Sequence, residues 1–326
     1  MRILSRLVLP ALLALASLTP ALGQSNADYA APRFLEGTGS AEADGVFPRT
    51  VVDEMGEVVI PAEPARIAVI QTGQLDGALS LGVVPVGAAR GIGLELYGDY
   101  HTRVFPQFAD RLAEMADLGS RQEPDIEAIA ALKPDLIFLN KAALVEDTYN
   151  ALRQIAPVVV TKGTGVNWKV DFLLIAHALG KAGEAQALLD RYHADAEAAR
   201  AAWADAPPTV SFVHSNGART RIMGVASFAG GIAEDLGLAR PQSQQFHGTS
   251  EDISPELLDQ ADAGWIFYSG QGDGVATITE APLWPTLSGV AAGQAVFVEY
   301  EPFYFNAGPA AARIVLETVA ETIGAP

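Results

Sequence analysis

Short apolar runs alternate with helical patterns along most of this chain. A short apolar run bounded by Gly, Pro or charged residues predicts a buried strand. In the first half, such strands are expected at residues 66–70, 83–89, 135–140 and 156–163. Between the first two lies the helical stripe of Leu75, Ala78 and Leu79, which stops at Gly82. Strands that alternate with helices predict a mainly parallel sheet covered by helices.

A second series of the same kind follows Pro207 and Pro208. Its strands are expected at residues 209–214, 219–224, 264–269 and 295–300, and its helices at residues 229–238, 254–260 and 308–324. The two halves also resemble each other. The stretch D-I-E-A-I-A-A-L-K-P-D-L-I-F begins at Asp125, and S-P-E-L-L-D-Q-A-D-A-G-W-I-F begins at Ser254. Asp and Ser are both favoured N-caps, so each stretch predicts a capped helix that leads into a strand.

One long helix is expected between the two series. From Glu184 to Ala204 there is no Gly or Pro. Apolar residues recur there in steps of three and four, at Ala185, Leu188, Tyr192, Ala196, Ala199 and Trp203. At 1.5 Å per residue this helix would be about 30 Å long, enough to connect two lobes. Without a helix breaker it should not bend sharply.

The sequence therefore predicts an α/β fold with two pseudo-symmetric α/β lobes, joined by one long rigid helix. The expected segments are a signal peptide at 1–23, a flexible arm at 24–45, an N-terminal lobe at 46–181, a bridging helix at 182–206 and a C-terminal lobe at 207–326.

The first residues have the pattern of a secretory signal peptide. Arg2 and Arg6 precede the apolar run Leu7–Leu18, and the small residues Ala21 and Gly23 follow where a signal peptidase prefers them. The apolar run is too short for a permanent membrane helix, which needs ~20 residues. The two arginines are not adjacent, so a Sec-type signal is favoured over a twin-arginine signal. Since the chain has no cysteine, we expect a periplasmic protein without a lipid anchor.

Charge and cysteine usage exclude several classes of function. The 326 residues include 39 Asp and Glu against 21 Lys and Arg, a net charge of −18. Loss of residues 1–23 would remove two basic and no acidic residues and bring the charge to −20. So acidic a chain repels phosphate backbones, which argues against a nucleic-acid partner. The absence of cysteine excludes disulfides, cysteine-ligated zinc, iron–sulfur clusters and thiol catalysis.

Motifs of metal, nucleotide and serine chemistry are missing. The histidines are scattered and form no H-x-x-H pair; they are His101, His177, His193, His214 and His247. A zinc or manganese site built on clustered histidines is therefore not expected. No Walker lysine and no G-x-G-x-x-G is present. Ser227 stands in G-V-A-S-F-A-G rather than G-x-S-x-G, which weakens the alternative of an exported α/β enzyme with a serine nucleophile.

The order and spacing of several fragments carry a family resemblance. They are D-E-M-G-E-V-V-I-P-A-E-P-A-R-I, L-D-G-A-L-S-L-G-V-V-P-V-G, R-Q-E-P-D-I-E-A-I-A-A-L-K-P-D-L-I, R-I-M-G-V-A-S-F-A-G, E-D-L-G-L and W-P-T-L-S-G-V-A-A-G-Q-A-V-F-V. The chain resembles substrate-binding proteins of ABC importers for ferric siderophores, haem and cobalamin. The resemblance implies two lobes, one bridging helix, a ligand cleft between the lobes and little hinge bending. The R-Q-E-P stretch favours the siderophore branch.

Candidate ligand residues are basic or aromatic and follow predicted strands, because ligands of open α/β sheets bind beyond the carboxyl ends of the strands. Arginine suits an anionic or oxygen-rich ferric chelate, and aromatic rings pack on its arms. By the resemblance, Arg121 matches the ligand-contacting arginine of the family. The candidate set is Arg121, Arg221, Arg219, Arg90, Lys141, Trp168, Tyr268, Tyr300 and Tyr304. For each of them, surface contacts or ordinary packing remain the alternative.

Glu127 and Glu256 stand two positions after the two helix N-caps. A glutamate in the first turn of a helix interacts favourably with the helix dipole, which by itself explains both residues. The resemblance implies a second role. In the family, one glutamate on each lobe docks into arginine pockets of the permease dimer.

We therefore expect reversible periplasmic capture of a ferric siderophore and its delivery to an inner-membrane ABC permease. The resemblance implies no catalysed reaction and no cofactor, since the iron arrives in the ligand and needs no direct protein ligand. A monomer is expected. A haem or cobalamin carrier of the same fold stays open, as do an exported α/β enzyme, the chelate class and a bare ferric citrate complex.

Overall fold

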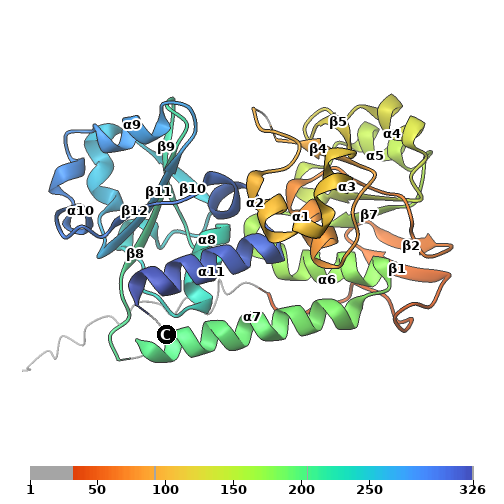
Figure 1. The fold of residues 1–326 in the computed structure, drawn as a ribbon, viewed down its shortest axis with the longest axis horizontal. Coiled ribbons are helices and arrows are strands. Elements are labelled where there is room, and N and C mark those ends of the chain that lie inside the picture. The colour runs from red at the N-terminus through yellow and green to blue at the C-terminus, as the bar shows by residue number, and fades with distance from the viewer. Residues whose placement is uncertain (1–31, 92, 204, 325–326) are drawn as a thin grey trace, which may run out of the picture.

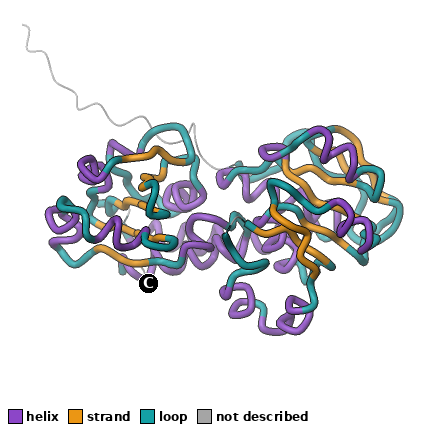
Figure 2. The backbone as a smooth tube through the Cα atoms, turned by 90° about the horizontal axis from the view of Figure 1, so that it is seen from above, coloured by secondary structure: helices purple, strands orange, loops and turns teal. Residues whose placement is uncertain are grey.

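Two α/β lobes lie side by side in the computed structural model, which describes residues 32–91, 93–203 and 205–324 (Figures 1 and 2). The predicted signal peptide lies outside the described residues. No helix of the described part is both long and apolar enough to cross a membrane. The expected α/β class with two lobes is confirmed.

The N-terminal lobe is built on a parallel sheet with the strand order β5-β4-β3-β6-β7. Its strands are β3 (Ile67–Val69), β4 (Gly87–Arg90), β5 (Ala116–Ser120), β6 (Leu136–Asn140) and β7 (Val158–Thr161). Its helices are α1 (Thr72–Ser80), α2 (Asp99–Val104), α3 (Ala109–Ala113), α4 (Ile126–Leu132), α5 (Glu146–Leu152) and α6 (Trp168–Leu179). A separate antiparallel hairpin precedes them, made of β1 (Arg49–Asp53) and β2 (Gly56–Ile60).

The C-terminal lobe repeats this order with the sheet β10-β9-β8-β11-β12. Its strands are β8 (Val210–Ser215), β9 (Thr220–Met223), β10 (Ser250–Ile253), β11 (Trp265–Gly270) and β12 (Ala295–Phe297). Its helices are α8 (Phe228–Asp235), α9 (Gly274–Thr279), α10 (Ser288–Ala291) and α11 (Pro309–Ile323), with a 3-10 helix η6 (Pro255–Ala261) and a π-helix η8 (Glu301–Phe305). The pseudo-symmetry of the lobes thus extends to the order of the strands.

Strand direction differs between the lobes. β9 runs antiparallel to β8 and to β10, so the expectation of a mainly parallel sheet holds for the N-terminal lobe and is wrong for this edge of the C-terminal sheet. The cause is the short turn from Asn216 to Arg219, whose backbone closes with an N–H···O bond of 3.2 Å. A parallel connection would need a crossover of a dozen residues or more.

The bridging helix α7 (Ala182–Ala202) runs beneath both lobes in Figure 1 and packs on α6, α8 and α11. It begins two residues before the expected Glu184 because the Asp44 carboxylate accepts the N–H groups of Ala182 and Gly183, both at 2.8 Å. It ends two residues before Ala204. Its buried residues are Ala185, Leu189, Tyr192, Ala196 and Ala199, so Leu189 takes the buried place that was expected for Leu188.

One hydrophobic core runs through both lobes. It includes Phe138 of the N-terminal sheet, Phe212 of the C-terminal sheet and Tyr192 of α7. Two smaller clusters fill the other face of each sheet. Because the main core is continuous across the junction, the lobes cannot separate without exposing apolar surface to water.

The segment expected as a flexible arm at 24–45 makes specific contacts in its described part, residues 32–45. Gly39 exchanges two backbone bonds of 2.8 Å with Val52, and the amide of Ser40 bonds the His177 ring at 3.0 Å. The Arg33 guanidinium reaches the Asp235 carboxylate at 3.4 Å. This segment is therefore attached to both lobes by specific contacts.

The second of the two matched helices also differs from expectation. Asp125 caps α4 by accepting the Ala128 N–H at 2.9 Å, as predicted. Ser254 makes no such bond, and the segment after it forms the 3-10 helix η6 with a kink at Leu257. The hydroxyl group of Ser254 bonds the Glu256 carboxylate instead, which lowers the pKa of that carboxyl group.

Candidate ligand-binding cleft

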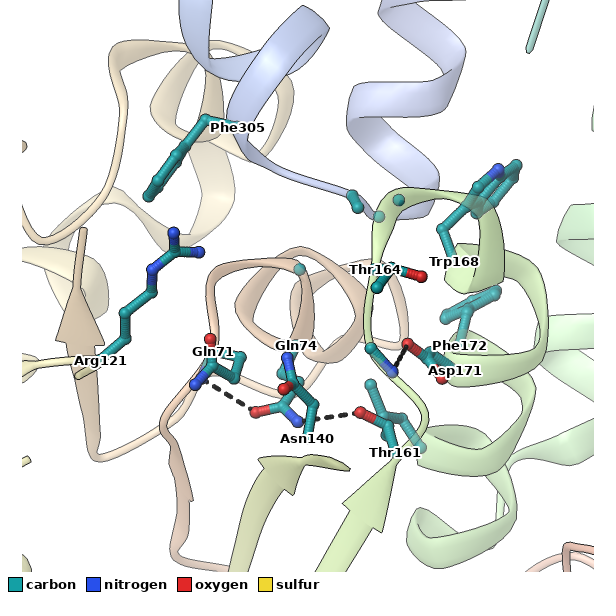
Figure 3. A pocket seen from close by; sticks show the side chains of 16 residues that line it. Gln71, Gln74, Arg121, Asn140, Thr161, Thr164, Trp168, Asp171, Phe172 and Phe305 are labelled. Carbon is teal, nitrogen blue, oxygen red and sulfur yellow. Dashed lines mark hydrogen bonds between the residues drawn. The ribbon is translucent and has the colours of Figure 1, made fainter. Parts of the chain in front are cut away.

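A polar pocket of about 140 Å³ lies where the order of the N-terminal sheet reverses, between β3 and β6 (Figure 3). Ligands of open α/β sheets bind at such points, beyond the carboxyl ends of the strands. Gln71 follows β3 here, and Asn140 and Thr161 end β6 and β7. Ala307 and Gly308 of the C-terminal lobe close the other side. The pocket therefore belongs to both lobes.

Arg121 enters this pocket from the loop after β5. Its amide donates to the Arg90 carbonyl at 3.0 Å, and its guanidinium lies 4.9 Å from the centre of the Phe305 ring. No carboxylate lies within ion-pair distance of Arg121 among the described residues. Burial lowers the pKa of Arg121, although the group still has ample margin to stay charged at neutral pH. The pocket thus holds a cation that forms no ion pair with any described residue.

Arg219 and Arg221 lie at the edge of the C-terminal sheet and share one carboxylate. The guanidinium of Arg219 donates to Asp252 at 2.7 Å, and that of Arg221 donates to Asp252 at 3.2 Å. These bonds, that of Arg219 first, lower the pKa of Asp252. Two guanidinium groups against one carboxylate leave a net positive charge at this edge.

Tyr300 interacts electrostatically with Arg121 of the N-terminal lobe and with Arg221 of the C-terminal lobe. Arg121 lies over the Phe305 ring beside it, and Arg221 is paired in register with His214 on the neighbouring strand. Burial raises the pKa of the Tyr300 phenol, and the positive charges of Arg121 and Arg221 lower it. The Tyr300 ring stacks on the His214 ring at 4.7 Å and lies 5.9 Å from the Phe305 ring. The structure therefore brings together Arg121, Arg221 and Tyr300, of which the first belongs to one lobe and the others to the second.

The remaining candidates make other contacts. Arg90 pairs with Asp117 at 2.8 Å, and the Lys141 ammonium donates to the Glu54 carbonyl at 2.9 Å, in both cases on the exposed surface of the N-terminal lobe. In the C-terminal lobe, the Tyr304 hydroxyl donates to the Phe267 carbonyl at 2.8 Å, and burial raises the pKa of Tyr304.

Tyr268 and Trp168 are packed by other rings. The Tyr268 ring lies edge-on to Trp284 at 4.9 Å. Trp168 is the first residue of α6 and lines the polar pocket, where it is 1% exposed and lies edge-on to Tyr192 and Phe228. Trp168 therefore combines the two alternatives that the sequence offered, a wall of the pocket and a packed core residue.

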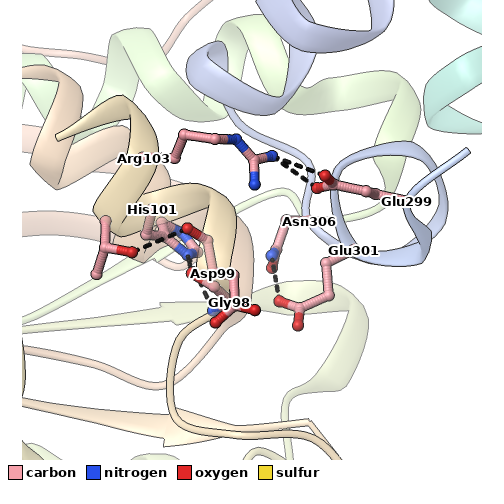
Figure 4. A network of polar contacts seen from close by, with 8 residues as sticks. Gly98, Asp99, His101, Arg103, Glu299, Glu301 and Asn306 are labelled. Atoms are coloured by element: carbon pink, nitrogen blue, oxygen red, sulfur yellow. Dashed lines mark hydrogen bonds and ion pairs between the residues drawn. The ribbon is translucent and has the colours of Figure 1, made fainter. Parts of the chain in front are cut away.

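An acidic region adjoins the arginines. A second cavity, of about 460 Å³, has Tyr300 on one wall and is also lined by Glu95, Asp99, Glu299 and Glu301. Figure 4 shows its polar contacts: Arg103 of α2 pairs with Glu299 at 2.8 Å, and Asn306 donates to Glu301 at 3.3 Å. Burial raises the pKa of Glu301, and the charges of Asp99, Glu299 and Glu95 raise it further. The cleft thus has a basic side and an acidic side.

Sequence reasoning missed Gln71, Asn140, His214 and Phe305 as cleft residues. Gln71 and Asn140 directly follow or end predicted strands, so the rule that found Arg121 could have found them. His214 is 4% exposed within β8, and its Nε2 has no partner among the described residues. Burial lowers the pKa of His214 to about 4, so the ring is neutral.

The described residues contain no cluster of His, Asp or Glu that could hold a metal ion. Ser227 is fully buried and caps α8: its hydroxyl donates to the Gly224 carbonyl at 2.7 Å and accepts the Gly230 N–H at 2.9 Å. Such a serine is not placed as a nucleophile. The geometry is that of a two-lobed protein with a binding cleft at the junction.

The chain belongs to the periplasmic binding protein family, whose sequence model matches residues 77–299. It is 30% identical over 303 residues to the probable siderophore-binding lipoprotein YfiY of Bacillus subtilis (strain 168), with 87% of this chain and 90% of that protein covered. It is 28% identical to the Fe(3+) dicitrate-binding periplasmic protein FecB of Escherichia coli (strain K12), with 84% and 90% covered.

Among solved structures, the chain is similar to SirA of Staphylococcus aureus complexed with staphyloferrin B. The TM-score is 0.74 at 26% identity, and the match covers 85% of this chain and 99% of that one. The expected membership in the family of periplasmic substrate-binding proteins is therefore confirmed, as is the fold.

Proposed function

We propose that this protein binds a ferric siderophore in the cleft and delivers it unchanged to an inner-membrane ABC permease. One observation carries the proposal: Arg121 and Arg221 come from different lobes and both lie near Tyr300, and Arg121 has no carboxylate partner among the described residues. Charge-assisted bonds from arginine suit an anionic or oxygen-rich chelate. The rings of Tyr300 and Phe305 offer flat surfaces for its arms. The names of the relatives support the same ligand class.

Fluorescence titration tests this function. The purified protein is titrated with ferric citrate, a ferric hydroxamate and a ferric catecholate, while the iron-free chelators serve as controls. We expect saturable quenching by at least one ferric chelate and recovery of that chelate unchanged. Absence of saturable binding across the panel would contradict the proposal, and chemical conversion of the chelate would favour an exported enzyme.

Haem is the second candidate ligand, because the Nε2 atom of His214 has no partner within the described ranges and its ring stacks on Tyr300. An imidazole nitrogen is a suitable axial ligand for haem iron. Hemin therefore belongs in the same titration. A Soret shift that is lost in His214→Ala would favour haem, whereas binding of hemin weaker than that of the ferric chelates would favour the siderophore.

For delivery, we propose Glu127 and Glu256 as the docking residues. Both are exposed. Glu127 lies in α4, which leads into β6, and Glu256 lies in η6, which leads into β11. β6 and β11 hold equivalent places in the two sheets, so each lobe carries one acidic residue at a matching position.

The proposal also includes the setting of the protein. We place it in the periplasm as a monomer without a lipid anchor, with lobes at 46–181 and 207–326 joined by the segment 182–206. The lack of any cysteine in the sequence supports the absence of an anchor, because the bacterial lipoprotein anchor is attached to a cysteine.

A further inference from the structure

The polar pocket contains a side-chain amide nitrogen that has no hydrogen-bond partner among the described residues. This nitrogen is the Nε2 of Gln71, which lines the pocket and is 4% exposed. A buried donor without a partner costs free energy, so such a group in a cavity points to a ligand that supplies the acceptor.

The neighbouring amide shows the contrast. Gln74 lies one helical turn further on in α1, and both ends of its side chain are engaged. Its Oε1 accepts the Gln71 backbone N–H at 3.1 Å, and its Nε2 donates to the Thr161 hydroxyl at 3.2 Å. The Thr161 hydroxyl in turn donates a hydrogen bond to the Leu139 carbonyl at 3.4 Å. Gln74 and Thr161 are therefore bonded to each other, and neither accepts a hydrogen bond from the Gln71 Nε2 in the structure.

The charges around the pocket favour an anion. Arg121 supplies a positive charge that no described carboxylate offsets. Asp171 is the one carboxylate among the described lining residues, and its oxygens already accept the backbone N–H groups of Lys162 at 2.8 Å and Gly163 at 2.9 Å. Trp168, with a buried Nε1 that also has no described partner, forms another part of the wall.

The size of the pocket limits what can enter. The pocket, of about 140 Å³, has room for several water molecules and therefore for a small polar group. Pockets for whole drug-sized ligands are typically ~300–1,000 Å³. The pocket can thus hold one arm of a chelate, while the iron centre and the rest of the ligand lie in the wider cleft beside Tyr300.

We infer that this pocket binds a free carboxylate arm of the ferric chelate, with Gln71 Nε2 as a donor and Arg121 as the charge partner. The inference rests on the proposed function and narrows it to chelates that keep a carboxylate free of iron. Gln71 would then be a specificity-determining residue, since a chelate without that arm leaves its amide unpaired.

Substitution of Gln71 tests this with matched probes. Gln71→Met keeps an unbranched side chain of similar length and removes the donor, and Gln71→Glu adds a repelling charge. Gln154→Glu, on the exposed surface of the N-terminal lobe, is the control for the added charge. The probes are ferric citrate and two forms of ferrioxamine B, one N-succinylated with a free carboxylate and one N-acetylated without it.

In the unsubstituted protein, we expect ferric citrate or the succinylated form to bind about tenfold or more tightly than the acetylated form. Gln71→Met should remove about tenfold of that preference, and Gln71→Glu should remove more, with circular dichroism and Tm showing that both variants fold. Gln154→Glu should behave as the unsubstituted protein does.

Two results would overturn the inference and leave the proposed function standing. One is tight binding of a chelate that has no free carboxylate, in preference to the carboxylate probes. The other is a preference for the carboxylate probes that Gln71→Met does not change. If no ferric chelate of the wider panel binds at all, the proposed function fails, and with it the inference.

Discussion

Arg121 is a cation in the cleft with no carboxylate at ion-pair distance in the described part of the chain, and Arg221 shares Asp252 with Arg219. If both act on the bound chelate, Arg121→Ala and Arg221→Ala should each raise Kd by ~10-fold or more, because a charge-assisted hydrogen bond contributes about 1.5–3 kcal/mol. Titration with the best ferric chelate measures this. Arg153→Ala is the control, since Arg153 is exposed and lies over Tyr149. Unchanged affinity in both cleft variants would remove the arginines from the site.

Asp171 should make binding depend on pH. Burial raises the pKa of Asp171 to about 7, against the lowering effect of the Gly163 and Lys162 N–H groups. Below that pH the carboxyl group is mostly neutral, and above it an ionised carboxylate repels an anionic arm in the same pocket. We expect affinity for a carboxylate-bearing chelate to fall roughly threefold to tenfold from pH 6 to pH 8. In Asp171→Asn this fall should disappear, and an equal fall in that variant would assign it to the chelate itself.

Single residues show where sequence reasoning stops. Arg121 was predictable because a basic residue after a predicted strand is visible in the sequence. The place of Gln71 after a predicted strand was visible in the same way, but the sequence could not show that its Nε2 lacks a partner among the described residues, because the bond between Gln74 and Thr161 joins positions 87 residues apart. The aromatic run near Tyr304 was recognised, but the π-helix η8 turns Phe305 toward Arg121 and the Tyr304 hydroxyl toward the Phe267 carbonyl.

At the scale of elements, a buried ion pair joins helices of different lobes. The Lys169 ammonium of α6 is fully buried and donates to both oxygens of Asp235 in α8, at 2.8 and 2.7 Å. The Tyr192 hydroxyl of α7 donates to the same carboxylate at 2.9 Å. Asp235→Ala would leave the buried ammonium with no carboxylate partner, and we expect a loss of about 3–5 kcal/mol in unfolding free energy, measured by urea denaturation.

An exposed ion pair provides the control for that loss. Lys181 pairs with Glu184 at 2.8 Å near the start of α7, where Glu184 is 58% exposed. Glu184→Gln should cost less than ~1 kcal/mol, because solvent screens such a pair. Equal losses in Asp235→Ala and Glu184→Gln would show that the buried pair contributes no more than an exposed one.

Helices and strands were predictable where polar and apolar residues alternate with a clear period. They were missed where a helix is buried on most sides or where a strand has few apolar residues. The helix α6 was not predicted because it is buried around most of its surface. Its residues 172–176 are all buried, so no polar face marks a helical period in the sequence. β10 escaped because it is an edge strand of sequence S-E-D-I with three exposed residues. The continuous pattern of α7 was predicted to within two residues at each end, since its polar and apolar faces are distinct.

At the scale of the whole molecule, the lobes are joined by more than α7. The buried carboxylate of Asp76 in α1 accepts the N–H groups of Ala310 at 2.8 Å and Ala311 at 3.0 Å, at the start of α11. With the Lys169–Asp235 pair and a shared core, these contacts oppose a hinge motion. Small-angle scattering should therefore show a radius of gyration that changes by no more than a few per cent when ligand is added. A large compaction would contradict a rigid junction.

Delivery of the chelate requires the whole molecule to dock on a permease, whereas capture of the chelate requires only the cleft. Glu127 and Glu256 stand at equivalent places in the two lobes, each in the first turn of the helix before β6 or β11. A permease with twofold symmetry presents two equivalent pockets, and one acidic residue per lobe meets that geometry. Such residues affect encounter and register rather than the chemistry of the cleft.

Charge removal at these two positions should therefore stop uptake without touching capture. In the double variant Glu127→Gln with Glu256→Gln, we expect chelate affinity and Tm to stay near those of the unsubstituted protein. Glu127→Gln removes only a small interaction with the helix dipole, and Glu256→Gln in addition weakens an exposed bond from the Ser254 hydroxyl. Uptake of the labelled ferric chelate into proteoliposomes with the cognate permease should collapse, and arginine at the same positions should be worse than glutamine. Glu146→Gln, at the start of the neighbouring helix α5, is the control for loss of an exposed first-turn glutamate. Normal uptake by the double variant would leave Glu127 and Glu256 with the helix dipole as their only role.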